Sequence, residues 1–105
     1  MKMIRAIVRP NKENNVVDNL EKDGFVSLTK MNVFGRGKQK GIRIGTVCYD
    51  EMPKVMIMLV VNDKDAQRAV NIIQNSARTG NIGDGKIFVT DVLEAYTVRT
   101  GEAGL

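Results

Sequence analysis

Seven consecutive apolar residues at positions 55–61, V-M-I-M-L-V-V, place the strongest constraint on the fold of this 105-residue chain. The run has the length of a β-strand and is far too short to span a bilayer. A strand that is apolar on both faces is typical of the centre of a sheet that is covered on both sides. We therefore expect residues 55–61 to form a central, buried strand, with the methionines of the strands filling the core.

The residues before this run predict two strands and one helix. Apolar and polar residues alternate over 2–9, which is the pattern of a strand with one buried face. A narrow apolar stripe predicts a helix over about 12–23, with Asn11 as its cap and Gly24 as its stop. Beta-branched residues favour a second strand over about 25–34.

The residues after the run predict one more helix and one more strand. Apolar residues recur at helical spacing over about 63–78, where Asn62 and Asp65 resemble a capping pair, and a fourth strand follows at about 86–90. The order βαββαβ is that of the ferredoxin-like α+β fold, in which two helices cover one face of a four-stranded antiparallel sheet. Apolar residues on the other face of that sheet predict an oligomer.

A long connection at about 36–53 separates the second strand from the central strand. It begins within G-R-G-K-Q-K-G at 35–41 and has no settled hydrophobic period. A loop of this length inside a compact domain is usually functional. Cys48 lies in this polar loop without a visible base beside it, and we interpret it as an incidental thiol.

Residues 79–86, T-G-N-I-G-D-G-K, combine three glycines, a carboxylate and a lysine between a predicted helix and a predicted strand. Glycine reaches positive φ, so Gly80, Gly83 and Gly85 can direct backbone N–H groups toward one point, with Lys86 as a nearby cation. The segment matches neither a Walker loop nor a dinucleotide-binding fingerprint. It suits the binding of a phosphate, and a plain tight turn is the alternative interpretation.

The composition narrows the classes of function. The chain has no histidine and one cysteine, so it offers neither an internal disulfide nor the usual zinc site, and no nucleophile–base pair is visible. A net charge of +4 favours anionic ligands in general. A nucleic-acid-binding module is a remote alternative, because the predicted strands lack stacking aromatic residues. We expect one cytoplasmic domain over 1–105 that is not an enzyme, does not insert into a membrane and binds no nucleic acid.

Three segments together resemble the PII signal-transduction proteins: G-x-G-x-Q-K-G at 35–41, A-R-T-G-N-I-G-D-G-K-I-F-V at 77–89 and R-T-G-E at 99–102. The resemblance includes the opening M-K-M-I-R-A-I-V-R-P and covers essentially the whole chain. Proteins of this family are trimers of ferredoxin-like subunits. They bind ATP or ADP in clefts between subunits and 2-oxoglutarate beside the nucleotide, at the base of a long T-loop that corresponds here to about 36–53.

The resemblance also implies which residues bind each ligand. Those expected to bind the nucleotide are Thr29, Gly35, Gly37, Lys38, Gln39, Gly83, Asp84, Gly85, Lys86, Phe88 and Arg99. Thr29 and Phe88 are expected to approach from a neighbouring subunit. Those expected to bind 2-oxoglutarate are Arg9, Gln39, Lys40, Gly41 and Lys54. Gln39 would also ligate Mg²⁺, together with oxygens of ATP and 2-oxoglutarate, and Lys54 would pair with the distal carboxylate of the oxo-acid.

Some residues depart from the family pattern. Lys38 stands where most relatives have arginine, which keeps the charge but loses the bidentate fork. Thr97 stands where relatives have the first arginine of R-x-R-T-G, so the preference between ATP and ADP stays open. The T-loop is shorter than in the enterobacterial type, and the tyrosine that those proteins present for uridylylation has no clear equivalent; Tyr49 is a weak candidate for modification.

The T-loop pattern, F-G-R-G-K-Q-K-G followed by Y-D-E-M-P-K-V-M-I-M-L-V-V, is most similar to PII-like proteins encoded in nitrogen-fixation clusters of methanogenic archaea and some anaerobic bacteria. Within that group of proteins, this chain resembles the first of two PII-like paralogues that associate with each other. This similarity implies a nitrogen-status sensor, as a homotrimer or as a hetero-oligomer with a PII-like paralogue, that inhibits nitrogenase through its T-loop until 2-oxoglutarate relieves the inhibition. Regulation of an ammonium channel or of another nitrogen-assimilation target is the alternative.

Overall fold

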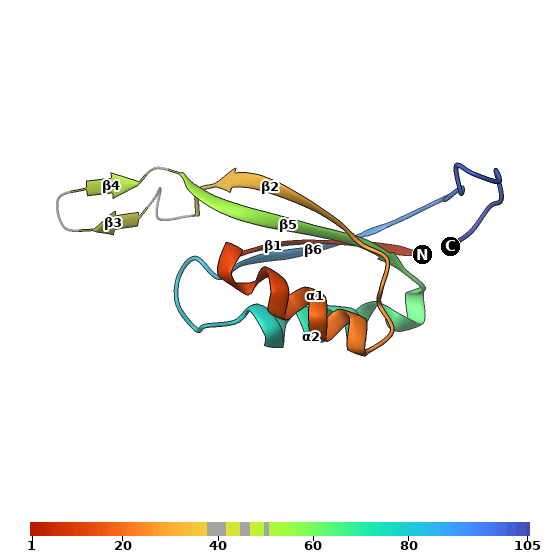
Figure 1. Cartoon of the computed structure of the whole chain (residues 1–105), viewed down its shortest axis with the longest axis horizontal. Helices are drawn as coiled ribbons and strands as arrows, with labels where there is room; N and C mark the ends of the chain where they lie inside the picture. The colour runs from red at the N-terminus through yellow and green to blue at the C-terminus, as the bar shows by residue number, and fades with distance from the viewer. Residues whose placement is uncertain (38–41, 45–46, 50) are drawn as a thin grey trace.

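The computed structural model describes residues 1–37, 42–44, 47–49 and 51–105. Four strands form one antiparallel sheet in the order β2-β5-β1-β6. They are β1 (Lys2–Val8), β2 (Thr29–Gly35), β5 (Met52–Val61) and β6 (Gly85–Asp91). The helices α1 (Glu13–Lys22) and α2 (Ala66–Ala77) lie together on one face of this sheet (Figure 1). The predicted ferredoxin-like α+β fold is therefore confirmed.

The core lies between the two helices and the sheet face that they cover. Successive strand residues point to opposite faces, so every second residue of β1 and β5 enters this core. The buried apolar residues are Ile4, Ala6, Val8, Val16, Leu20, Val55, Ile57, Leu59, Val61, Ala69, Ile73 and Ala77. Complete burial of one side chain of isoleucine size contributes about 1.5–3 kcal/mol, so this single layer supplies most of the driving force for folding.

The predicted side-chain caps of the helices are wrong. The short 3-10 turns η1 (Pro10–Lys12) and η2 (Asp63–Asp65) precede α1 and α2, and no side-chain cap hydrogen bond forms at the start of either turn or either helix. Neither Asn11 nor Asn62 with Asp65 therefore acts as predicted. A 3-10 turn continues directly into the helix and supplies carbonyl acceptors of its own, which removes the need for a side-chain cap.

The stop of α1 is confirmed. Gly24 has φ +92°, and the Phe25 N–H donates to the Leu20 carbonyl with an N···O distance of 2.9 Å, which is the pattern of a Schellman motif. The second strand begins at Thr29 and not at 25, because Phe25 and Leu28 pack against the core before the sheet begins.

The long connection contains two strands that were not predicted. β3 (Ile42–Ile44) pairs antiparallel with β4 (Val47–Tyr49) beyond the ends of β2 and β5 (Figure 1). Cys48 therefore belongs to a strand and not to a polar loop. The missed signal is the short alternation I-R-I, which has the period of a strand but is only three residues long.

Neither helix covers the other face of the sheet, which we call the open face. Strand alternation and register assign to it Met3, Arg5, Ile7, Thr29, Met31, Val33, Lys54, Met56, Met58, Val60, Lys86, Phe88 and Thr90. The central strand is thus buried on one face only within the chain. The prediction that the strand methionines fill the core is wrong, because Met31, Met56 and Met58 alternate with the core residues; Met31 is 46% exposed.

The helices of the described part of the chain are too short or too polar for membrane spans, since none of them meets the length and apolarity that crossing requires.

Candidate ligand-binding site

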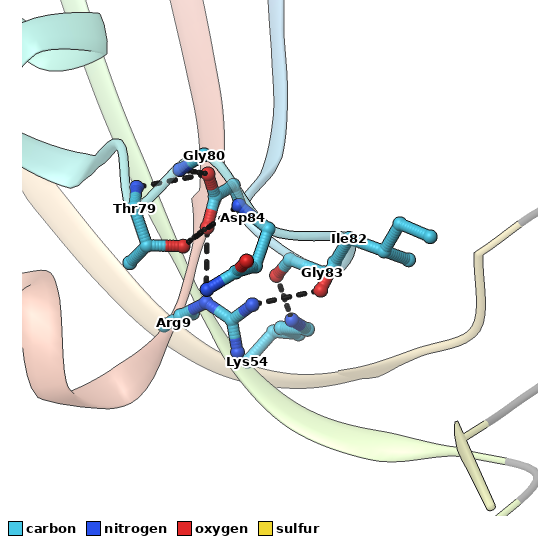
Figure 2. A network of polar contacts seen from close by, with 8 residues as sticks. Arg9, Lys54, Thr79, Gly80, Ile82, Gly83 and Asp84 are labelled. Carbon is cyan, nitrogen blue, oxygen red and sulfur yellow. Dashed lines mark hydrogen bonds and ion pairs between the residues drawn. The ribbon is translucent and has the colours of Figure 1, made fainter.

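The glycine loop after α2 closes on its own carboxylate. Asp84 accepts hydrogen bonds from the backbone N–H groups of Thr79 and Gly80, each with an N···O distance of 2.9 Å, and from the Thr79 hydroxyl (Figure 2). These bonds hold the pKa of Asp84 well below its usual range, with the Thr79 hydroxyl as the largest cause and the Thr79 N–H as the next. The loop is therefore a preformed turn in which the carboxylate is already occupied.

Arg9 ties this loop to the end of β1. Its Nε donates to Asp84 Oδ1 at 3.1 Å, and its Nη2 donates to the carbonyl oxygen of Ile82 at 2.8 Å (Figure 2). Gly83 has φ +101°, and a Cβ atom there would lie 3.1 Å from Arg9 Nη2. Glycine at this position therefore permits both the turn and the close packing of the guanidinium against it.

Lys54 enters the same site from β5. Its ammonium group donates to the carbonyl oxygen of Gly83 (Figure 2). Burial lowers the pKa of Lys54, and the charge of Arg9 lowers it further, while the charge of Asp84 acts in the opposite direction. In the part of the chain that the structure describes, Lys54 forms no direct ion pair with a carboxylate. Two half-buried cations thus share one carboxylate, and the site attracts anions.

Several of the predicted ligand-binding residues gather here. Gly35, at the end of β2, lies beside the Lys54 side chain, because a Cβ atom at Gly35 would be 3.7 Å from Lys54 Cγ. Gly37 follows two residues later. Gly85 begins β6 opposite Val8, and Lys86 follows it on the open face. The predicted residues Lys38, Gln39, Lys40 and Gly41 lie outside the described residues.

Three predicted nucleotide residues lie elsewhere. Thr29 and Phe88 share one row of the open face, in the register Thr29–Met58–Arg5–Phe88. Arg99 belongs to the C-terminal segment that follows β6, and Figure 1 shows this segment at the opposite end of the molecule from the glycine loop. A single copy of the chain therefore does not bring these residues to the glycine loop.

The end of the molecule near Thr29 has a groove of its own, with a volume of about 790 Å³. Its lining includes Phe25, Leu28, Thr29, Val60 and Leu105. The C-terminal segment at this end folds back on itself through a bridge between Tyr96 and Ala103 and leaves Val98 fully exposed.

Sequence reasoning missed two contributors to the site, Thr79 and the carbonyl oxygen of Ile82. Thr79 supplies two of the hydrogen bonds to Asp84, and it also accepts one from the Asn81 N–H at 3.1 Å. A threonine at the start of a glycine-rich turn often accepts a hydrogen bond from the backbone N–H two residues later. The residue type of Thr79 was therefore a signal that the sequence offered. The acceptor role of the Ile82 carbonyl carries no sequence signal, because every residue has a carbonyl oxygen.

The hydrogen bonds of Asp84 predict how stability depends on pH. Because the folded-state pKa lies below the usual 3.8, ionised Asp84 stabilises the fold above that pH, and the contribution is lost as the pH falls toward the folded-state pKa. Asp84→Asn should therefore lower the urea midpoint at pH 7, and the gap from the unsubstituted protein should narrow at about pH 3. Asp18→Asn, at an exposed position of α1, is the control. A gap of equal size at both pH values would show that Asp84 does not act through its charge.

Comparison with known proteins places this geometry in a family. Residues 1–102 match the family described as "Nitrogen regulatory protein P-II". The chain is 60% identical over 105 residues, and over the full length of both proteins, to "Nitrogen fixation nifHD1 region GlnB-like protein 1" of Methanosarcina barkeri. It is equally similar to "Nitrogen fixation nifHD region glnB-like protein 1" of Methanococcus maripaludis, at 60% over 105 residues and 100% of both chains. It is 46% identical over 108 residues to "Nitrogen regulatory protein P-II 1" of Methanothermobacter thermautotrophicus, which covers 99% of this chain and 94% of that protein. With the fold, the glycine loop and these full-length similarities in agreement, the chain belongs to the nitrogen regulatory protein P-II family.

Proposed function

We propose that this protein is a nitrogen-status sensor and not a catalyst, that it binds ATP or ADP together with 2-oxoglutarate, and that it inhibits nitrogenase until 2-oxoglutarate relieves the inhibition. The observation that carries the proposal is the state of Lys54. Its half-buried ammonium group is held by a neutral carbonyl oxygen, while the nearby carboxylate is occupied by the loop and by Arg9. A carboxylate of a dicarboxylic acid would give Lys54 the counter-charge that it lacks.

The placement of the nucleotide residues supports a site shared between copies of the chain. The glycine loop and the last residue of β2, Gly35, lie toward one end of the molecule. The first residue of β2, Thr29, and the C-terminal segment that carries Arg99 lie toward the other end, as the course of these segments in Figure 1 shows. A nucleotide that contacts both sets therefore requires a second subunit. The apolar open face and the exposed C-terminal segment supply surfaces that such an oligomer would cover. A homotrimer, or a hetero-oligomer with a PII-like paralogue, would meet this requirement.

Mg²⁺ would be bound mainly by oxygens of the other ligands and not by a cluster of protein side chains. Among the described residues, no three acidic or thiol side chains gather to hold a metal, and Asp84 is occupied by the glycine loop. The ion would therefore take most of its oxygen ligands from ATP phosphates and 2-oxoglutarate, with Gln39 as the protein ligand. Lys40 and Gly41 would complete the oxo-acid pocket beside Gln39.

The T-loop is connected directly to this site. It leaves the sheet after Gly35 and returns at Met52, two residues before Lys54. A ligand that binds Lys54 and the start of the loop can therefore favour one loop state over another. About 1–3 kcal/mol of coupling between ligand and loop state would give a usable response.

The names of the relatives favour nitrogen fixation as the regulated process, since they refer to nifHD regions. An ammonium channel or another nitrogen-assimilation enzyme is the second candidate, because loop shape selects the target. Affinity isolation of the protein from a nitrogen-fixing cell extract separates the two. Recovery of nitrogenase subunits favours the first, whereas recovery of a channel favours the second.

Calorimetric titration of 2-oxoglutarate into the purified protein tests the ligand part of the proposal. We expect binding in the presence of Mg²⁺ and ATP, and none when ADP replaces ATP. Gln39→Ala should abolish the response to 2-oxoglutarate and leave ADP binding largely intact, because it removes the proposed protein ligand of the metal that joins ATP and 2-oxoglutarate. Failure of the unsubstituted protein to bind 2-oxoglutarate with either nucleotide would contradict the sensor mechanism for this chain alone.

A further inference from the structure

The open face carries positive charge without any carboxylate. Arg5 lies near its centre, in the row Thr29–Met58–Arg5–Phe88, with an apolar or aromatic neighbour on each side. Lys54 and Lys86 are the other charged residues of this face, and both are also cations. The open face is therefore largely apolar, and all of its charged residues are cations. An apolar patch of this kind is typical of a surface that another molecule covers.

Some cations elsewhere in the described sheet and helices have acidic partners, whereas Lys22, at an exposed position of α1, takes part in none of the ion pairs among the described residues. Lys30 pairs with Glu13 at 2.8 Å, and Arg68 pairs with Asp23. Arg9, beyond the end of β1, pairs with Asp84 at 3.1 Å. Within the described residues Arg5 forms no such ion pair. Arg5 differs from an exposed cation such as Lys22 in its place, because it is partly buried on the apolar face that a neighbouring subunit would cover.

A subunit that covers the open face removes water from Arg5. If that subunit offers the same face of the same chain, it adds only further cations, and an unpaired guanidinium in an interface is costly. A subunit that presents an aspartate or glutamate to Arg5 instead forms a charge-assisted hydrogen bond in a partly desolvated place. The charge of the face thus discriminates between these two occupants.

We propose that Arg5 makes the open face selective for a partner subunit that presents a carboxylate to it, so that oligomers with such a partner are more stable than oligomers of this chain alone. The selectivity combines attraction to the acidic partner with repulsion between identical copies. The proposal rests on the oligomer proposed above, and it adds the residue and the charge that choose the partner.

The test uses an Arg5→Glu variant of the same chain as the acidic partner. The unsubstituted protein and Arg5→Glu, carrying tags of different mass, are unfolded together, refolded in low salt and weighed by native mass spectrometry. Oligomers that contain only one of the two chains should be at least about tenfold rarer than random assembly predicts. This follows because a charge pair worth about 1.4 kcal/mol in the interface changes the equilibrium constant tenfold. The depletion should decrease at high salt, which screens the charges.

Lys64→Glu is the matched control, because it makes the same charge change at an exposed position of η2, away from the open face. It should mix randomly with the unsubstituted protein. Random mixing of Arg5→Glu as well would overturn the proposal, since another carboxylate of an identical copy would then neutralise Arg5. If every mixture contains only monomers, the proposed oligomer itself is contradicted.

A second measurement does not depend on the folding of Arg5→Glu. Self-association of the unsubstituted protein should strengthen several-fold as salt rises from about 0.05 M to about 0.5 M, because screening relieves repulsion between copies of Arg5. Sedimentation in the two salts, with Arg5→Gln for comparison, measures this. Self-association that weakens with salt, or that Arg5→Gln leaves unchanged, would contradict the inference.

Discussion

Replacement of Gly85 by alanine is expected to destabilise the fold by at least about 3 kcal/mol, a large part of the stability of a domain of this size. A Cβ atom at Gly85 would lie 1.7 Å from the carbonyl oxygen of Ile7 and 2.8 Å from its carbonyl carbon. Both atoms belong to the backbone of β1, so no side-chain movement relieves the clash. The φ of +111° adds strain for any residue with a Cβ.

Gly80→Ala is the matched control for this prediction. Gly80 also has positive φ, at +90°, but no atom lies within 4 Å of its Cβ position. It should therefore cost only the strain of the left-handed conformation, about 1–2 kcal/mol. Urea denaturation of the two variants measures the difference. Equal losses would mean that β6 can move away from β1 easily, whereas a Gly85→Ala chain that is already unfolded without urea would agree with the expectation.

Replacement of Lys54 by methionine is expected to weaken 2-oxoglutarate binding at least about 30-fold, because losing one partner of a buried charge pair costs roughly 2–5 kcal/mol. Methionine keeps an unbranched apolar chain but removes the ammonium group and its hydrogen bond to Gly83. Burial already lowers the pKa of this lysine, so an incoming carboxylate would stabilise its charged form. Calorimetry with Mg²⁺ and ATP present measures the change.

Two comparisons make the result specific. Lys22→Met, in the last turn of α1, removes an exposed ammonium group far from the glycine loop and should leave the affinity unchanged. ADP affinity of Lys54→Met should stay within a few-fold of the original, since the proposed contact is with the oxo-acid. An unaltered 2-oxoglutarate affinity in Lys54→Met would remove this residue from the site and leave the nucleotide assignment untouched.

Local patterns were sufficient to predict the order of strands and helices. Alternation in β1, the apolar run of β5 and the helical spacing of α2 are properties of short stretches, and the structure confirmed each as the predicted strand or helix. The stop at Gly24 was predictable for the same reason, because a left-handed residue after a helix needs glycine. The helix caps failed, because a 3-10 turn can take the place of a capping side chain.

The candidate site depended on contacts between distant segments. The sequence motif placed Asp84 in a ligand-binding loop, but only the folded loop showed that Thr79, Gly80 and Arg9 occupy its carboxylate. Lys54 and Gly83 are 29 residues apart, and no local pattern predicts that they touch. The register of three strand pairs likewise decided which residues share the open face.

Amino-acid pattern therefore established the fold class and the glycine loop of this P-II family protein, since both follow from interactions within a few residues. Tertiary structure decided the face on which the methionines lie, the counter-charge of Arg9 and the separation of Thr29 and Arg99 from the glycine loop. The physical reason is strand pairing: a shift of one residue in register turns every side chain of a strand to the opposite face, and the energy that selects the register comes from the whole core.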